Sequence, residues 1–314
     1  MEEREIVKRF LDIGIQLTDE AFNIVKKDPE FFLSEIKKLR LKPFFLTKSL
    51  VEEMLKKKEE PKCETIKEIQ ISKNPLRLED YAKFYLKKYE KIKDIFVKNG
   101  FSAISINKIG EMTKEFPTIG LIKEKKKTSL VIEDPTGEIE VFFEGILKQK
   151  LDEVETDDVV FVFCERDKEK FVVKKILHPD IPLNRDVKKA REDVILKITK
   201  NNDNQLSPKK YTNIVWLRLY EINFLIIPRT FFEAINIQFK SEDVVKLLKK
   251  RFLFPLTVDY IIKNPEDFVL EELPDIVITD LEPSICKNYK GTTIVSVFDK
   301  SYEINLYTRE VKEI

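Results

Sequence analysis

Apolar residues recur at helical spacing through residues 2–58, which predicts a compact set of four helices. Residues typical of helix starts precede the second and third of them, Thr18 and Asp28 followed by Pro29, and the fourth is expected from about Ser49. On the first helix, the apolar positions expected to share one face are Ile6, Val7, Phe10 and Leu11. We interpret residues 1–58 as an interaction module, because helical units this small more often bind other proteins than catalyse reactions.

The apolar period is lost in residues 59–76, which contain Pro61 and Pro75, and we predict a linker there. A long amphipathic helix that leads into the next domain is predicted within residues 77–116, with Gly100 just beyond its end. Its apolar stripe consists of Leu78, Tyr81, Phe84, Tyr85, Ile92, Ile95 and Phe96. Aromatic side chains can also stack on nucleic-acid bases, but at helical spacing we favour packing into a core.

From residue 117 to residue 182 the pattern changes to five short apolar runs rich in Val, Ile and Phe, separated by turns or charges. A helical stretch, GILKQKLDEV, stands between the third run and the fourth. The sequence Asp-Pro-Thr-Gly at 134–137 has the composition of a tight turn, and strict alternation follows it. This order predicts a five-stranded β-barrel of the OB type.

Residues 183–314 predict a mixed α/β domain. The stretch 183–210 is polar and is expected to include a loop, whereas NIVWLRLYEINFLIIP predicts strand or buried core. A helix follows, for which Ser241 is a suitable N-cap, and the last part of the chain predicts three strands. The fold class is therefore multidomain α+β, with a helical module, a barrel and a mixed α/β domain.

Charge and composition narrow the class of protein. The chain has 314 residues, 36% of them charged, with a formal net charge of only +1, which argues against a protein that simply coats nucleic acid. Abundant Lys and Glu with few glycines is typical of a thermophile, although an AT-rich genome also favours lysine. The three cysteines are far apart and indicate neither a disulfide framework nor a zinc site.

The chain starts with a charged helical segment, MEEREIVKR, and no apolar run approaches the ~20 residues that span a bilayer. A cytoplasmic protein without membrane contact is therefore expected.

A cluster of lysines in the first hairpin of the predicted barrel is the candidate binding site for single-stranded DNA: Lys123, Lys125, Lys126 and Lys127. Such residues flank the face on which OB folds hold a single strand, and that face normally also carries exposed aromatic side chains. Phe142 is the obvious aromatic candidate here. Because there are few such aromatics, we favour a solvated hairpin tip over a DNA site.

The order of segments resembles the small subunit of the archaeal family D DNA polymerase over most of the chain. The segments that carry the resemblance are YAKFYLKKYEKIKDIF followed by AISINKI, VIEDPTGEIEV, HPDIPL, DVVKLLKKRFLFP and ELPDIVITDLEPSICKNYKGTTIVSV. The resemblance implies that residues 183–314 derive from a calcineurin-like phosphoesterase domain. It also implies docking to a large polymerase subunit or another replication protein.

The departures from this family concern its metal ligands. Active members bind two metal ions through D-x-H, G-D, G-N-H-D and G-H-x-H motifs for 3′–5′ exonuclease cleavage, and none of these motifs occurs here. At the positions of G-H-x-H stand Asp280, Leu281, Glu282 and Pro283, and at an H-G-x-S-like segment stand Ile227, Pro228, Arg229 and Thr230. Residues 183–211 also leave no room for the central metal-binding loops. The resemblance therefore implies a shortened, degenerate domain with no metal and no cofactor.

The residues lead to the same expectation without the family. A single histidine, His178, cannot build a His-rich dimetal site and is expected to pack at the domain junction. The best acidic candidates are Asp275 and Asp280, at the end of an apolar strand, where aspartate is also a common turn former. No phosphate-binding loop and no nucleophile–base motif is present.

Three functions remain open. The leading hypothesis is a non-catalytic relative of the polymerase small subunit that serves as a scaffold or accessory protein in DNA replication or repair. The alternatives are a stand-alone single-stranded-DNA-binding OB protein and a residual metal-dependent 3′–5′ exonuclease.

Overall fold

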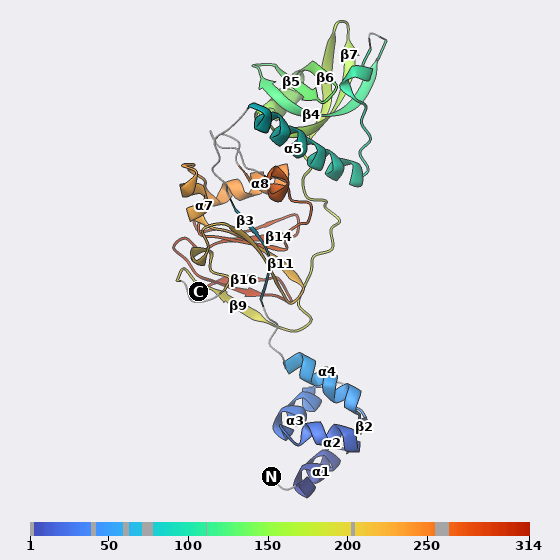
Figure 1. Ribbon diagram of the computed structural model, residues 1–314, viewed down its shortest axis with the longest axis vertical. Coiled ribbons are helices and arrows are strands. Elements are labelled where there is room, and N and C mark those ends of the chain that lie inside the picture. The colour runs from blue at the N-terminus through green and yellow to red at the C-terminus, as the bar shows by residue number, and fades with distance from the viewer. Residues whose placement is uncertain are drawn as a thin grey trace. The chain divides into compact units, whose positions relative to one another are not determined.

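The computed structural model describes residues 3–38, 42–58, 63–70, 78–110, 112–201, 205–254 and 264–314. The chain falls into two compact units, Met1–Lys62 and Cys63–Ile314, which Figure 1 colours along the chain. Their boundary lies inside the predicted linker. Among the described helices, none is long and apolar enough to cross a membrane.

The first unit is helical, as predicted. Its described elements are α1 (Glu3–Asp12), α2 (Asp19–Val25), α3 (Pro29–Lys38) and α4 (Lys48–Lys58), with β1 (Gln16–Leu17) pairing in parallel with β2 (Phe45–Leu46). The predicted caps at Thr18 and Asp28 are confirmed, because their side-chain oxygens accept hydrogen bonds from the backbone N–H of Ala21 and Phe31, both at 3.3 Å. These caps and a shared apolar core define the unit.

The apolar face of α1 is only partly buried. Ile6 and Phe10 are buried in the core, but Val7 and Leu11 are 37% and 51% exposed. Four apolar positions in two turns make a stripe wider than the surface that the rest of this small unit covers. Of the four residues predicted to share a face, Ile6 and Phe10 therefore form its buried part.

The second unit contains a closed five-stranded barrel with strand order β4-β5-β6-β8-β7. Its strands are β4 (Glu115–Lys125), β5 (Ser129–Asp134), β6 (Gly137–Phe142), β7 (Val159–Asp167) and β8 (Lys170–Leu177). A 3₁₀ turn, η2 (Gly145–Leu147), and the short helix α6 (Lys148–Leu151) stand between β6 and β7, where the sequence predicted a helix. The β6–β8 pairing is parallel, and the other pairings are antiparallel.

Alternating residues of β6 point into the barrel and fill its interior. Val141 and Phe143 are buried, whereas Glu138 between the turn and them is exposed. Gly120 in β4 lies at a close approach, since a Cβ there would lie 3.2 Å from both Ile132 Cβ and the Glu133 carbonyl oxygen.

Two further sheets follow the barrel. Among the described residues, six strands form one sheet in the order β13-β14-β12-β11-β10-β3, in which β11, β12 and β14 are mutually parallel. These strands are β3 (Glu64–Ile69), β10 (Ile214–Leu219), β11 (Ile222–Ile227), β12 (Ile276–Thr279), β13 (Cys286–Tyr289) and β14 (Thr292–Ser296). The second sheet is antiparallel and consists of β9 (Ile195–Ile198), β15 (Tyr302–Asn305) and β16 (Val311–Glu313).

Several of these strands depart from the predictions. β3 lies within the predicted linker, β9 lies within the predicted loop, and the last part of the chain forms five strands, β12 to β16, where three were expected. β3 is an edge strand in which Ile69 alone is buried, so its sequence has no apolar period to detect. The rest of the predicted linker, with Pro61 and Pro75, lies outside the described residues.

Successive residues of the parallel strands pack on opposite faces of the sheet, into two different hydrophobic cores. Leu225 and Ile227 of β11 pack toward the helices, whereas Phe224 and Ile226 pack toward the second sheet. Figure 1 shows β9 and β16 on the far side of the large sheet from α7 (Arg229–Ala234) and α8 (Val244–Lys250).

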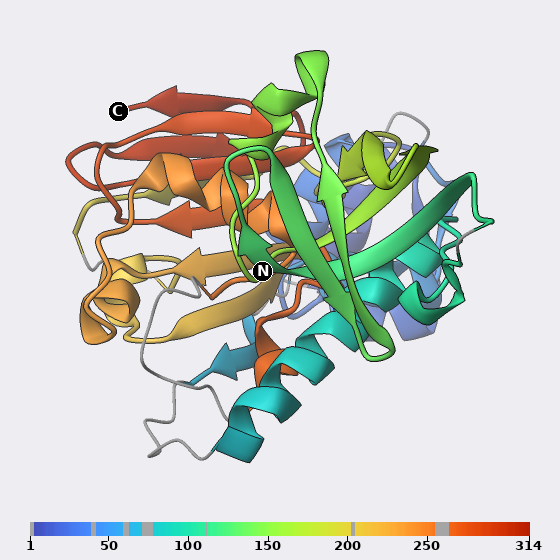
Figure 2. The ribbon, with the colours of Figure 1, turned by 90° about the horizontal axis from the view of Figure 1, so that it is seen from above.

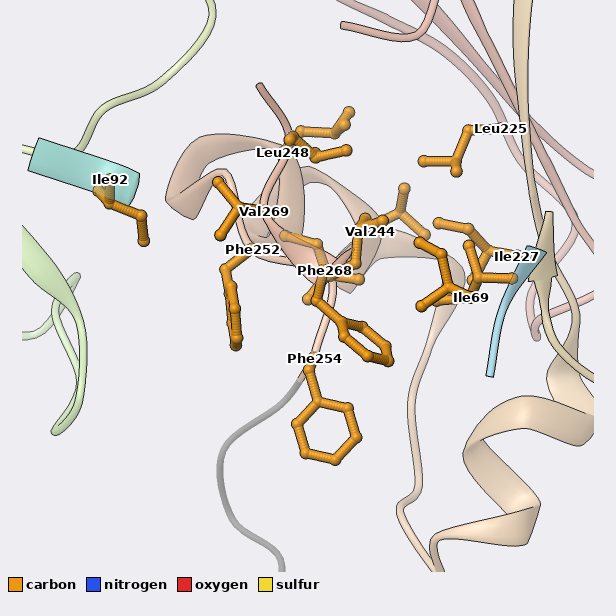
Figure 3. Packing of buried hydrophobic residues seen from close by; sticks show 14 of the residues in the cluster. Ile69, Ile92, Leu225, Ile227, Val244, Leu248, Phe252, Phe254, Phe268 and Val269 are labelled. Atoms are coloured by element: carbon orange, nitrogen blue, oxygen red, sulfur yellow. The ribbon is translucent and has the colours of Figure 1, made fainter. Parts of the chain in front are cut away.

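Helix α5 (Leu78–Lys98) joins the barrel to the sheet and lies between the barrel strands and α8 (Figure 1). The predicted core role of its stripe is confirmed for Phe84 and Phe96, which are 5% and 0% exposed. Figure 3 shows Ile92 of α5 in the same cluster as Phe252 and Leu225. Figure 2 shows the barrel strands and α5 in green and cyan, with the helices and strands of residues 205–314 in orange and red.

Candidate functional site

The carboxyl ends of β11, β12 and β14 meet at one edge of the large sheet. Ile227 stands opposite Thr279, and Thr279 stands opposite Ser296. In sheets of this kind, ligands bind at the carboxyl edge of parallel strands. Residues 227–230 and 280–283, which the sequence singled out as altered metal motifs, directly follow β11 and β12. The structure therefore brings the two segments together.

Asp280 ties these two segments to each other. It is 7% exposed, and its Oδ1 accepts a hydrogen bond from the backbone N–H of Arg229 at 2.7 Å. Pro228 is the N-cap residue of α7, so this bond holds the first turn of that helix. Burial raises the pKa of Asp280, and the Arg229 N–H partly offsets that rise. The carboxylate thus has a structural partner within the protein.

The three residues after Asp280 also make structural contacts within the protein. Leu281 is 2% exposed and belongs to the core between the sheet and the helices. The carbonyl groups of Glu282 and Pro283 accept hydrogen bonds from the backbone N–H and the hydroxyl of Ser241, at 3.0 and 2.6 Å. Ser241 was expected to cap a helix, but its hydroxyl is committed to this loop, and Lys240 occupies the N-cap position.

A cavity of about 640 Å³ lies at this edge. Its walls include Phe232 stacked on Phe239, with ring centroids 4.3 Å apart, and Arg229 paired with Glu233 at 2.7 Å. Across the described ranges, no group of three or more His, Cys, Asp or Glu side chains is arranged to hold a metal ion. Paired charges and aromatic rings suit contact with protein side chains better than they suit ion binding.

Asp275 lies at the opposite end of β12 from Asp280, and the expectation that both stand at one strand end is wrong. The four residues of β12 stand between them, so they are five residue steps apart, about 16 Å at 3.3 Å per step. Asp275 accepts hydrogen bonds from Arg185 Nη2 at 2.6 Å and from the backbone N–H of Asn223 at 2.9 Å. The two aspartates cannot share a metal ion, and Asp275 holds strand ends together.

The lysines of the barrel hairpin, between β4 and β5, each lie beside an acceptor of their own, apart from Lys127, which is exposed. Lys123 Nζ lies 2.5 Å from Glu138 Oε2, and Lys126 Nζ lies 3.1 Å from Glu140 Oε1. Those hydrogen bonds raise the pKa of both lysines. Lys125 Nζ donates to the Val154 carbonyl at 2.9 Å, away from the other two.

Phe142 completes the predicted DNA-binding set. It is half-buried, and Lys170 Nζ lies 5.0 Å from its ring centroid. The ring face is thus already covered by a cation from the neighbouring strand. Lys126 pairs with Glu140, two residues before Phe142 on the same strand, so the cations near Phe142 are already engaged within the barrel.

A buried charge cluster at the junction of barrel and sheet was missed by sequence reasoning. Asp158 is 4% exposed, and its two oxygens lie 2.8 Å from Lys250 Nζ and 3.2 Å from His178 Nε2. Burial lowers the pKa of His178 to about 4, against the opposing effect of Asp158, so this histidine is neutral at pH 7. His178 lies at the junction, as expected. Its partner could not be inferred, because the pairing depends on closure of the barrel.

Lys88 belongs to the same junction. Its side chain is fully enclosed, and Nζ donates to the Asp157 carbonyl at 2.5 Å and lies 4.5 Å from the ring centroid of Phe252. Burial lowers its pKa to about 7. A signal for Lys88 existed in the sequence, since it stands four residues from both Phe84 and Ile92 on the apolar stripe of α5.

No protein-family model matches this chain, and no curated protein matches its sequence. The resemblance to the polymerase small subunit therefore rests on the sequence segments quoted above.

Proposed function

We propose that this chain is a non-catalytic relative of the family D polymerase small subunit that acts as a docking scaffold in DNA replication or repair. The carboxyl edge of β11 and β12 carries this proposal. At the two motif positions of that family, Asp280 holds the start of α7, Leu281 fills the core, and the next carbonyl groups bind Ser241. In this proposal, residues at the positions where active members bind metal instead form internal hydrogen bonds and core contacts that stabilise the fold.

The barrel supports the architectural part of the proposal. Its order β4-β5-β6-β8-β7, its parallel β6–β8 pair and the helix between β6 and β7 are what an OB-type barrel requires. From β8 the chain passes through His178-Pro179-Asp180 toward a sheet with parallel central strands. We interpret that sheet with α7 and α8 as the shortened phosphoesterase-like domain.

A docking role is compatible with the loss of metal ligands, because docking needs a rigid surface. The barrel, α5 and the sheet share one apolar core, which includes Phe161, Phe96 and Leu225. Elements that share a core move together, so a partner would meet one body. The proposed partner is the large subunit of a family D polymerase, or another replication protein.

Mixing the purified full chain with the purified large subunit from the same organism tests this proposal. We expect co-elution in size-exclusion chromatography with light scattering, at the mass of a complex. Separate elution at micromolar concentrations would contradict docking to that subunit.

A nuclease assay tests the non-catalytic part separately. With Mn²⁺ and single-stranded DNA, we expect background cleavage that Asp280→Asn leaves unchanged. Metal-dependent cleavage that Asp280→Asn abolishes would show that the edge is catalytic.

Binding of single-stranded DNA at the hairpin is less favoured. Lys123 and Lys126 are neutralised by Glu138 and Glu140, and Phe142 is covered by Lys170.

A further inference from the structure

A cavity of about 660 Å³ lies where the barrel meets the sheet. The end of α5, helix α6, the segment after β8, α8 and the turn between β13 and β14 all contribute to its walls. Its charged lining residues are Lys98, Lys150, Lys249, Lys290, Glu153 and Asp180. Ligand sites occur preferentially at such junctions, and this volume lies within the range of small-molecule sites.

The lysines of this cavity exceed the carboxylates that neutralise them. Lys150 and Lys249 share Glu153, at 2.6 and 2.9 Å. Their hydrogen bonds lower the pKa of Glu153 to about 2, so one negative charge faces two positive charges at neutral pH. Lys98 is 3.8 Å from Glu271, which already pairs with Lys91 at 2.7 Å.

Asp180 supplies no spare negative charge. Its carboxylate accepts hydrogen bonds from the Tyr289 hydroxyl at 2.9 Å, from Lys290 Nζ at 2.6 Å and from the backbone N–H of Ile181 at 2.6 Å. His178 in the same wall is neutral at pH 7 and bonds to Asp158. The cavity thus carries an excess of positive charge that comes from lysines.

Two properties make this excess significant. The side chains of Lys249 and Lys290 are 31% and 27% exposed, so water screens them less than it screens the hairpin lysines. Like charges that converge on a partly enclosed space repel each other unless an anion lies between them.

The remaining wall is apolar and includes Phe101, Leu177 and Pro179. Phe101 packs against Phe161 with ring centroids 4.9 Å apart, so its position is fixed. A ligand with a planar apolar part and at least two negative charges fits both halves of the lining.

We propose that this cavity binds the phosphate groups of a nucleotide or of a single nucleic-acid strand, with Lys150 and Lys249 as the main phosphate contacts. The site is distinct from the barrel hairpin. It also stands without the scaffold function, because it depends only on the lining of the cavity.

The test uses the full chain and a fluorescein-labelled oligothymidylate of about 12 nucleotides, followed by anisotropy at low salt. ATP and inorganic pyrophosphate are the second and third probes, measured by titration calorimetry. Binding of the oligonucleotide alone identifies a strand as the source of the phosphate, and binding of ATP or pyrophosphate identifies a free nucleotide or phosphate. Each of these results supports the site only when the variants below lower the affinity.

The variants are Lys150→Gln with Lys249→Gln, and the matched control is Lys123→Gln with Lys126→Gln. Both pairs remove two partly exposed, carboxylate-paired lysines, and thermal melting checks that both fold. We expect the cavity pair to weaken binding about 10-fold or more and to reduce the salt dependence, because each phosphate contact releases counterions. The control pair is expected to change binding less than about 3-fold.

Three results would overturn the proposal. They are absence of binding for all three probes at low salt, an equal loss in both variant pairs, and a larger loss in the hairpin pair. An equal loss in both pairs would indicate general electrostatic attraction. A larger loss in the hairpin pair would indicate that the phosphate groups bind at the hairpin.

Discussion

The barrel hairpin and the junction between barrel and sheet contain the same kinds of charged residue in different surroundings. Lys126 in the hairpin and its partner Glu140 on β6 are both exposed to solvent by more than a third of their side chains. At the junction, Asp158 is 3% exposed and Lys250 is 20% exposed. Exposed ion pairs contribute little to stability, whereas a buried charge without its partner is strongly unfavourable. The number of lysines in a segment therefore predicts neither its contribution to stability nor its function.

Removing the carboxylate at the centre of the junction is expected to have the largest effect. Asp158→Ala removes the acceptor of His178 and of the backbone N–H of Glu155, which donates to Asp158 at 2.9 Å, while Lys250 keeps its second partner, the carboxylate of Glu155. Because buried donors lose their acceptor, we expect a loss of about 1–3 kcal/mol in the free energy of unfolding, measured by urea denaturation.

The matched control is Glu140→Ala in the hairpin, which also removes a carboxylate that accepts from a lysine and from a hydroxyl, that of Ser129. We expect its urea midpoint to stay close to that of the wild type. Equal losses in both variants would show that burial does not distinguish the two regions.

A pH-dependent difference between two adjacent lysines of α5 is the next largest effect. Lys88 is buried with a pKa lowered to about 7, whereas Lys87 is exposed and pairs with Glu266 at 2.9 Å. Since the unfolded chain keeps the proton of Lys88 up to its ordinary pKa near 10.5, unfolding takes up a proton between these values. The contribution of Lys88 to stability therefore increases as the pH rises above 7.

Replacing Lys88 by Met removes this dependence. We expect the stability of the wild type, relative to Lys88→Met, to increase with pH between 7.5 and 9.5, by at most about 1.4 kcal/mol per pH unit. Lys87→Met is expected to show no such trend. Parallel pH profiles for wild type and Lys88→Met would mean that Lys88 keeps an ordinary pKa in the folded protein.

The five strands of the barrel could be predicted from the sequence, because each is six residues or longer and forms an apolar run bounded by turns or charges, with alternation where Val141 and Phe143 stand. β3 and β9 could not, since an edge strand with one buried residue, such as Ile69 or Ile198, has no period. The junction was partly accessible. Lys88 stands in an apolar stripe, but the pairing of Asp158 with His178 requires β7 and β8 to be placed first.

The carboxyl edge of the sheet shows the same limit. The sequence located residues 227–230 and 280–283 as positions without metal ligands, and the register of β11 and β12 then placed them together. It could not show that Asp275 and Asp280 lie at opposite ends of β12, because both flank the same short apolar run. Local pattern identifies strands, whereas the partners of a side chain depend on tertiary pairing.

The smallest expected effect is the coupling between Lys126 and Glu140, and it is the most direct test of the comparison. A double-mutant cycle with Lys126→Gln and Glu140→Gln removes each partner alone and then both together. Because both side chains are hydrated, we expect no measurable coupling in urea denaturation at physiological salt. A weak coupling should emerge at low salt, where screening is reduced. A coupling that is large and independent of salt would mean that the hairpin pair behaves like the buried one, and burial would then cease to explain the difference between the two regions.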